Sequence, residues 1–179
     1  MNKITRKNAI STWPLAFMFL VLVAIAFSGC VKGSVCGYKD QNVSASAAEI
    51  AYLQQYFASA GITNVTQHSS GVFYTVNTPG TGLTPNLCSN VTVNYSAYRL
   101  GVATSFNSYT DPNGIRLLLG QLIVGIQKTL PQIKEGGSIT MYIPPSLGYG
   151  SSVQQDANGT IILPANSYLK FDMNILSVL

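Results

Sequence analysis

Three segments in the second half of the chain alternate between apolar and polar residues. They are residues 91–98, 138–143 and 169–175. Such alternation is typical of antiparallel strands in a sheet that is covered on one side only. Residues 70–76, which precede the turn Pro79-Gly80-Thr81-Gly82, predict a further strand.

One short helix is predicted to cover the apolar side of this sheet, at residues 126–133. Pro131 lies inside it and removes a helical hydrogen bond unless it falls in the first turn, so the helix must be brief. The expected fold is therefore of the α+β class, with a curved antiparallel β-sheet wrapped around one short helix.

A capping box predicts an earlier helix at residues 47–60. Ser46 and Glu49 have the spacing at which each side chain bonds the other's backbone N–H, and Gly61 ends the helix. The apolar residues that follow at helical spacing are Ile50, Leu53, Tyr56 and Phe57. We interpret this stripe as a packing face on the following domain, and a dimer contact is the alternative.

The N-terminus has the pattern of a secretory signal peptide. Basic residues precede an apolar run, residues 13–27, and small residues follow it. The run is shorter than the ~20 residues of a membrane-spanning helix, so a permanent transmembrane anchor is the less favoured interpretation. Phe27-Ser28-Gly29-Cys30 resembles the bacterial lipobox, which implies a signal peptide at residues 1–29 and a lipid on Cys30. The alternative is a plain signal peptide with an incidental cysteine.

Charge argues against a nucleic-acid partner. Lys3, Arg6 and Lys7 carry most of the formal net charge of +4. From Cys30 onward, seven Lys and Arg residues face six Asp and Glu residues, all scattered singly. The mature chain therefore lacks the basic patch that nucleic acids require.

Cysteine and histidine content argues for export and against a metal site. If Cys30 carries lipid, Cys36 and Cys88 remain as an even pair, which favours a disulfide in an oxidising compartment over two buried thiols. His68 is the only histidine, and no Cys-x-x-Cys motif is present. We expect no metal ion and no cofactor.

Five segments of the second half resemble, in order and spacing, the FKBP-type peptidyl-prolyl isomerases, the macrolide-binding family. They are VTVNYSAY, Ser-Phe-Asn, LLLGQLIVGI, KEGGSITMYIPPSLGYG and ILPANSYLKFDMNIL. The resemblance implies an FKBP-like isomerase domain at residues 70–179. A tether at residues 30–45 and a helical extension at residues 46–69 would precede it.

The resemblance also assigns residues to a substrate pocket. Those with catalytic roles would be Tyr95, Phe106, Asn107, Tyr149 and Phe171. Those that bind substrate would be Ile115, Leu117, Leu122, Ile123, Ile126 and Leu163. Ile123 matches the position whose backbone N–H holds a substrate carbonyl. For every one of these side chains, plain core packing is the alternative.

Several positions depart from the family pattern. Asn107 stands where the family has a pocket aspartate, and Ile126 stands where a tryptophan forms the floor. Ile115 and Leu117 replace phenylalanines. These changes predict a slower or differently selective isomerase. The barrier to isomerisation arises from amide resonance, so an apolar pocket that favours the twisted amide needs no nucleophile or cofactor.

The resulting prediction is a lipid-anchored envelope protein that faces the periplasm and isomerises X–Pro bonds in unfolded or exported polypeptides. Macrolides are the inhibitors that the resemblance implies. Val31 follows Cys30, where lipoproteins retained at the inner membrane commonly have aspartate, so the outer membrane is favoured. One alternative is a binding or chaperone module without turnover. Another is an envelope structural protein that assembles through the helix at residues 47–60.

Overall fold

The structure is a computed structural model that describes residues 36–179. The predicted signal peptide, residues 1–29, and the predicted lipidation site Cys30 lie outside the described residues. Gly37–Leu179 group into a single unit by their internal contacts. Among the described residues, no helix combines the length and the apolarity needed to span a bilayer.

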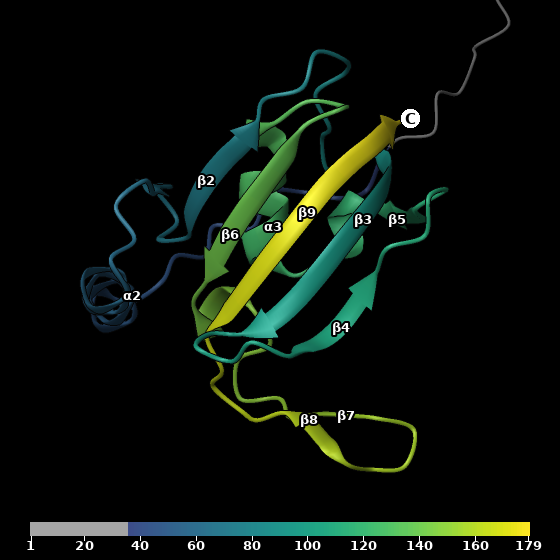
Figure 1. The fold of residues 1–179 in the computed structure, drawn as a ribbon. Coiled ribbons are helices and arrows are strands. Elements are labelled where there is room, and N and C mark those ends of the chain that lie inside the picture. The colour runs from purple at the N-terminus through teal and green to yellow at the C-terminus, as the bar shows by residue number, and fades with distance from the viewer. Residues whose placement is uncertain (1–35) are drawn as a thin grey trace, which may run out of the picture. The chain divides into compact units, whose positions relative to one another are not determined.

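An antiparallel sheet forms the body of the fold (Figure 1). Within residues 36–179 its seven strands are β1 (Thr66–Gln67), β2 (Phe73–Thr78), β3 (Asn90–Arg99), β4 (Ser105–Tyr109), β5 (Ile115–Leu118), β6 (Ser138–Ile143) and β9 (Leu169–Val178). They run in the order β1-β2-β6-β9-β3-β4, and β5 also pairs with β3. All four predicted strands are present, as β2, β3, β6 and β9. The predicted α+β fold is confirmed.

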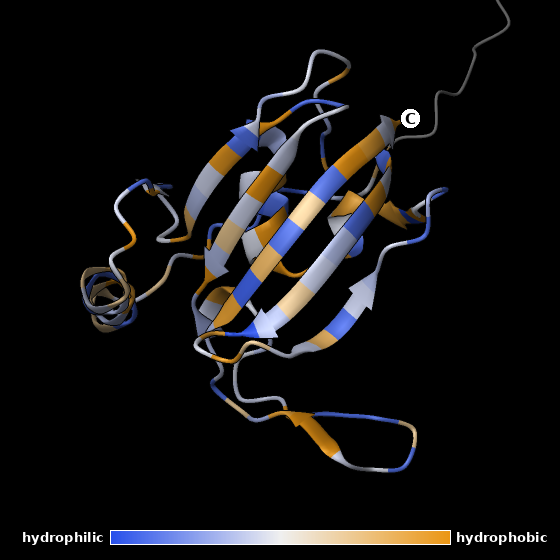
Figure 2. Cartoon of the chain, in the orientation of Figure 1, coloured by the Kyte–Doolittle hydropathy of each residue, from blue (hydrophilic) through white to orange (hydrophobic). Residues whose placement is uncertain are grey.

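The alternation along the central strands separates a buried face from a polar one. Figure 2 shows hydrophobic and hydrophilic bands alternating along β9. The inward side chains of β3, β6 and β9 are buried in the main core, and they are Val91, Val93, Ala97, Ile139, Met141, Ile143, Leu169, Phe171, Met173 and Ile175. Fully burying one Val, Leu, Ile, Phe or Met side chain stabilises a fold by about 1.5–3 kcal/mol.

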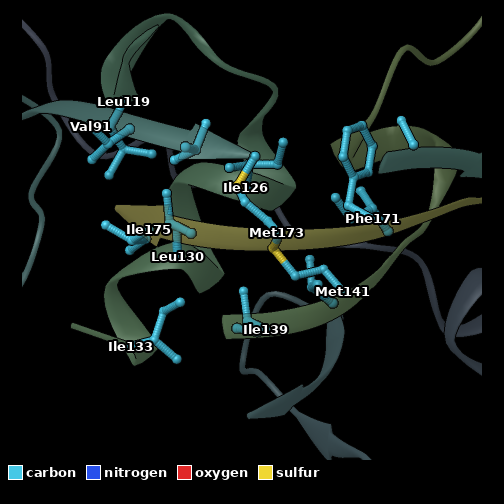
Figure 3. Packing of buried hydrophobic residues seen from close by; sticks show 14 of the residues in the cluster. Val91, Leu119, Ile126, Leu130, Ile133, Ile139, Met141, Phe171, Met173 and Ile175 are labelled. Carbon is cyan, nitrogen blue, oxygen red and sulfur yellow. The ribbon is translucent and has the colours of Figure 1, made fainter. Parts of the chain in front are cut away.

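The predicted helix at residues 126–133 is shorter and begins earlier than expected. It consists of α3 (Val124–Thr129) followed by a 3-10 turn, η2 (Leu130–Gln132). Pro131 lies in the first turn of η2, where its missing N–H breaks no helical hydrogen bond. Ile126 and Leu130 lie among the buried side chains of β6 and β9 (Figure 3).

Gly125 lets α3 approach β6 closely. A Cβ atom at this position would lie 2.4 Å from Cγ2 of the buried Ile143, well inside van der Waals contact. Only a residue without a side chain fits there, so this glycine sets the distance between helix and sheet. The structure also has two further 3-10 turns, η1 (Leu119–Gln121) before α3 and η3 (Pro145–Leu147) after β6.

The N-terminal helix α2 (Ala47–Ala60) has the predicted bounds. Both hydrogen bonds of the capping box are present, and Gly61 closes the helix in the left-handed conformation at φ 65°. Leu53 and Phe57 are buried against Phe73 and Tyr142 of the sheet. Phe57 contacts both rings edge-on, with centroid separations of 5.1 and 4.9 Å. The stripe is thus a packing face on the domain, and Leu53 and Phe57 offer no surface to a second molecule.

Glu49 joins α2 to the turn η3. Its carboxylate accepts hydrogen bonds from the backbone N–H and the hydroxyl of Ser146, both at 2.9 Å. It also accepts from the N–H of Ser46 at 2.8 Å and from the Ser46 hydroxyl at 2.9 Å. Burial raises the pKa of Glu49, but these four bonds outweigh it and lower the pKa below the ordinary value of 4.5. The charged form is therefore the one that holds the helix to the turn.

Cys36 and Cys88 are both disulfide-bonded. Disulfides form and persist in oxidising compartments, so this chemistry indicates a protein that folds outside the cytoplasm.

We predict that Glu49→Gln lowers the free energy of unfolding by about 1–2 kcal/mol at pH 7, because hydrogen bonds to the charged carboxylate are lost. The folded-state pKa is lowered, so the stabilisation is present above pH 4.5 and is lost as the pH falls through the folded-state value. Denaturant unfolding of both proteins at pH 7 and at about pH 3.5 should show the difference shrinking at the lower pH.

The control for this prediction is Gln55→Ala, an exposed position on the same helix. It should leave the unfolding curve nearly unchanged at both pH values. A deficit in Glu49→Gln that does not depend on pH would contradict a role for the charge.

Candidate active site

A cavity of about 260 Å³ lies between the sheet and the beginning of α3. Its lining consists of Tyr95, Ala97, Phe106, Asn107, Leu117, Gln121, Leu122, Ile123, Ile126, Tyr149, Phe171 and Met173. None of these twelve residues carries a charge, and the only polar side-chain groups are two amides and two phenol hydroxyls. The cavity is thus a neutral, mostly apolar site with few hydrogen-bonding groups.

Three aromatic rings form one wall of the cavity. Phe171 on β9 is buried, and the ring of Tyr95 on the neighbouring β3 lies 6.5 Å from it, centre to centre. Phe106 on β4 meets Phe171 edge-on at 6.4 Å, with an interplanar angle of 89°. Such edge-to-face contacts hold aromatic rings in defined orientations.

A bulge in β4 explains why two neighbouring residues both face the cavity. Side chains of successive strand residues normally point to opposite faces. The pairing of β3 with β4 shifts between Ala97, which opposes Asn107, and Tyr98, which opposes Ser105. Phe106 is left without a partner, and such an extra residue re-aims side chains. As a result, Phe106 and Asn107 line the same cavity.

Asn107 lies at the rim and is exposed. Its carbonyl oxygen Oδ1 accepts a hydrogen bond of 3.3 Å from the hydroxyl of Tyr95. The distance is long for an O–H···O bond. A neutral amide thus occupies the position to which the sequence assigned a catalytic role.

Tyr149 presents a hydroxyl that donates to no other described residue. It follows the turn η3, which Glu49 holds through Ser146, and it is half-buried. Burial, and next the neighbouring Tyr95, raise the pKa of Tyr149. The hydroxyl therefore keeps its proton at neutral pH and can act as a hydrogen-bond donor in the cavity.

Ile123 supplies a second donor. It is the cap residue before α3, and its carbonyl accepts from the N–H groups of Ile126 and Gln127. Its own N–H lies before the first helical turn and bonds to no other described residue. This N–H and the Tyr149 hydroxyl are therefore two donors beside the cavity that can bind a ligand, in addition to the side-chain amides of Asn107 and Gln121.

Gln127 holds the segment that carries this N–H. The side chain is buried, and its Nε2 donates to the carbonyls of Gly120 at 3.1 Å and Leu122 at 2.6 Å. The bonds connect α3 to the preceding turn η1. Sequence reasoning missed this residue, although a glutamine among the apolar positions of a short helix was a usable signal.

Nine of the eleven residues assigned to the pocket from the sequence line this cavity. The two that do not are Ile115 and Leu163. Ile115 lies on β5 opposite Val93 and packs against the main core, while Leu163 is fully buried in that core. For these two the geometry favours the core-packing alternative.

Three lining residues were not anticipated, namely Ala97, Gln121 and Met173. Ala97 follows Tyr95 by two positions on β3, and Met173 follows Phe171 by two on β9. Because alternate residues of a strand share a face, both could have been predicted from Tyr95 and Phe171. Among residues 36–179, no three side chains of His, Cys, Asp or Glu gather in a group that could hold a metal ion.

Comparison with known proteins shows which family this chain resembles. The chain is 31% identical to FkpA of Escherichia coli over 153 residues, which cover 86% of this chain and 54% of that protein. It is 33% identical to the peptidyl-prolyl cis-trans isomerase Mip of Coxiella burnetii over 110 residues, 62% of this chain and 46% of Mip. The crystal structure of Escherichia coli FkpA superposes with a TM-score of 0.60, at 31% identity over 74% of this chain and 60% of that one.

The chain thus spans about half the length of these curated relatives. A family model described as "FKBP-type peptidyl-prolyl cis-trans isomerase" matches residues 83–176, slightly more than half of the chain. The matched segment contains every residue that lines the cavity. This protein belongs to the family of FKBP-type peptidyl-prolyl cis-trans isomerases.

Proposed function

We propose that this protein catalyses cis–trans isomerisation of X–Pro peptide bonds in the cavity between α3 and the sheet. The observation that carries the proposal is an uncharged, aromatic-walled cavity with two unpaired hydrogen-bond donors, Ile123 N–H and Tyr149 hydroxyl. Family membership supports the same activity.

The chemistry follows from the electronic structure of the peptide bond. Resonance makes the amide planar and polar, and it creates a barrier of ~18–20 kcal/mol. The twisted transition state has lost this conjugation and part of its polarity. A poorly solvated, apolar cavity disfavours the planar form relative to the twisted form, and this differential binding lowers the barrier.

Each group in the cavity has a proposed role in this scheme. Tyr95, Phe106 and Phe171 would hold the pyrrolidine ring of the substrate proline. The N–H of Ile123 and the hydroxyl of Tyr149 would bind carbonyl oxygens on the two sides of the ring and so fix the peptide while the amide rotates. No covalent step, metal ion or cofactor enters.

A binding module without turnover is the second candidate function. The observation that favours it is Asn107, a neutral amide with a long hydrogen bond to Tyr95 at the position where the resemblance expects aspartate. Without a negative charge the rim polarises a bound peptide less. The cavity would then grip proline-containing segments and release them unchanged.

We further propose that the protein works in the cell envelope, held by a lipid on Cys30 after removal of residues 1–29. The lipobox-like residues and the disulfide-bonded cysteines support this. Two acyl chains give stable anchoring without a spanning helix. Residues 30–45 would be the tether, residues 46–69 the helical extension and residues 70–179 the isomerase domain.

The proposed substrates are proline-containing polypeptides that fold after export. Uncatalysed X–Pro isomerisation takes tens of seconds and limits folding, and the scheme above consumes no ATP. Macrolides would compete for the same cavity. Val31 after Cys30 supports the outer membrane as the site of the anchor, facing the periplasm.

Turnover tests the proposed activity directly. The full chain, purified in mild detergent, should accelerate isomerisation of a short X–Pro peptide. Tyr149→Phe removes one hydrogen bond and should lower kcat/KM about 3- to 10-fold. Asn107→Asp places a charged acceptor beside the Tyr95 hydroxyl and should raise kcat/KM about 2- to 10-fold. Leu83→Ser, an exposed position outside the cavity, is the control. If the folded protein shows no rate above background in any variant, the isomerase proposal is wrong and the binding module is favoured.

The rate of isomerisation should not depend on pH near neutrality. No carboxyl, imidazole, amine or guanidinium group lines the cavity, and burial raises the pKa of Tyr149 away from neutrality. The rate should therefore be constant between about pH 6 and pH 8. A bell-shaped profile of kcat/KM in this range would show that a titrating group outside the named set takes part.

The proposed lipid on Cys30 can be tested by metabolic labelling. Cells that express the protein and are fed an alkyne-tagged fatty acid should label the wild-type chain and retain it in the membrane fraction. Cys30→Ser should abolish both effects because it removes the acceptor thiol, whereas Cys88→Ser should keep the label. Labelling that survives Cys30→Ser would refute the assignment.

A further inference from the structure

Phe106 also lines a second hollow, which the proposed chemistry does not use. This hollow, here called the rim groove, has a volume of about 410 Å³. Its lining consists of Arg99, Val102, Thr104, Ser105, Phe106, Ile161, Ile162 and Pro164. One wall is the connection from β3 to β4, and the other is the strand β8 (Ile161–Leu163) with the residue that follows it.

The rim groove gathers apolar side chains that the fold leaves in water. Ile161 is 57% exposed, Ile162 38% and Val102 36%. These side chains contribute less burial than core residues of the same size, so the stability of the fold does not explain their position. Clustered exposed apolar residues mark interaction sites more often than scattered ones do.

The hairpin that carries the two isoleucines is built to present them. The strand β7 (Gln154–Gln155) pairs with β8, and the hairpin projects beyond the end of the sheet (Figure 1). The pairing shifts between Leu163, opposite Gln154, and Ile161, opposite Gln155, which leaves Ile162 as a bulged residue. The bulge lets the neighbours Ile161 and Ile162 both line the groove.

Both ends of this hairpin are fastened. Leu163 is fully buried in the main core at its base. At its tip, the carboxylate of Asp156 accepts from the N–H groups of Asn158 and Thr160, both at 2.9 Å. β8 is hydrophobic along its length and stands free of the sheet in Figure 2. A preorganised apolar strand of this kind loses little conformational freedom when a ligand binds.

We propose that the rim groove binds an apolar side chain of the same polypeptide whose proline occupies the cavity. The inference rests on the proposed function of that cavity. Its basis is continuity, because Phe106 lines both hollows. An extended chain advances ~3.3–3.6 Å per residue, so a side chain two or three positions from the proline reaches past one aromatic ring.

The chemistry of the groove defines the preferred occupant. Ile161, Ile162, Val102 and Pro164 offer contact to a Leu, Ile or Phe side chain, and Arg99 is the single charged residue in the lining. A basic residue at that substrate position would meet like charge, while an acidic neighbour would not. The preferred substrate therefore has a large apolar residue two or three positions from proline and no lysine or arginine beside it.

The test compares two peptides that differ at one position. Both contain one proline, and one has leucine while the other has serine at the same position. Such a pair is made for each position two or three residues before or after the proline. Isomerisation by the full chain in mild detergent is followed by NMR exchange, without a coupling protease. We expect the wild-type protein to prefer the leucine peptide in kcat/KM about tenfold. The double variant Ile161→Ser/Ile162→Ser should reduce this preference to about twofold or less.

Leu83→Ser is the matched control, because Leu83 is 64% exposed and lines neither hollow. It should keep the preference. An equal rate with both peptides in the wild-type protein would overturn the proposal, as would a preference that survives the double variant. Using the ratio of two peptides removes any general loss of activity or folding from the result.

Calorimetric binding of the same peptides separates this proposal from the proposed function. Leucine-dependent affinity that disappears in the double variant would support the groove even if no peptide is turned over. Absence of leucine-dependent affinity alongside normal turnover would refute the groove alone. If sedimentation shows a dimer that the double variant abolishes, the groove binds a second copy of the chain and the proposal is wrong.

Discussion

The close packing of α3 on the sheet is the contact on which the site depends. Gly125 allows the helix to lie against Ile143, and Ile126 and Leu130 are buried beside the strands. A six-residue helix covers only part of a sheet whose central strands have ten residues. The cavity lies where α3 begins, between the helix and the sheet. The space for the proposed substrate is therefore set by how α3 packs on the strands.

Departures from regular strand pairing supply the walls around this space. Phe106 in β4 and Ile162 in β8 are both extra residues in their strands. Each departure brings two neighbouring side chains to one hollow, whereas strict alternation would turn them to opposite faces. Phe106 connects the cavity to the rim groove for the same reason. Each of the two hollows is thus lined by a bulged residue and its neighbour.

The polar contacts of the site act on the backbone around it. Gln127 holds the turn before Ile123, and Glu49 holds the turn before Tyr149. The N–H of Ile123 and the hydroxyl of Tyr149 are thus placed by buried or multiply bonded groups. Inside the cavity no charge is present, which suits a reaction whose transition state is less polar than its ground state.

Local signals in the sequence determined the secondary structure of this protein. The capping box and Gly61 defined α2, alternation located β3, β6 and β9, and the turn after residues 70–76 indicated β2, because these patterns depend on near neighbours along the chain. Family spacing located nine lining residues of the cavity. Only the tertiary structure decided that Leu163 belongs to the core, that Glu49 reaches Ser146 and that Gln127 braces the site. These contacts depend on how distant segments pack, and the two bulges depend on strand register, which local composition does not encode.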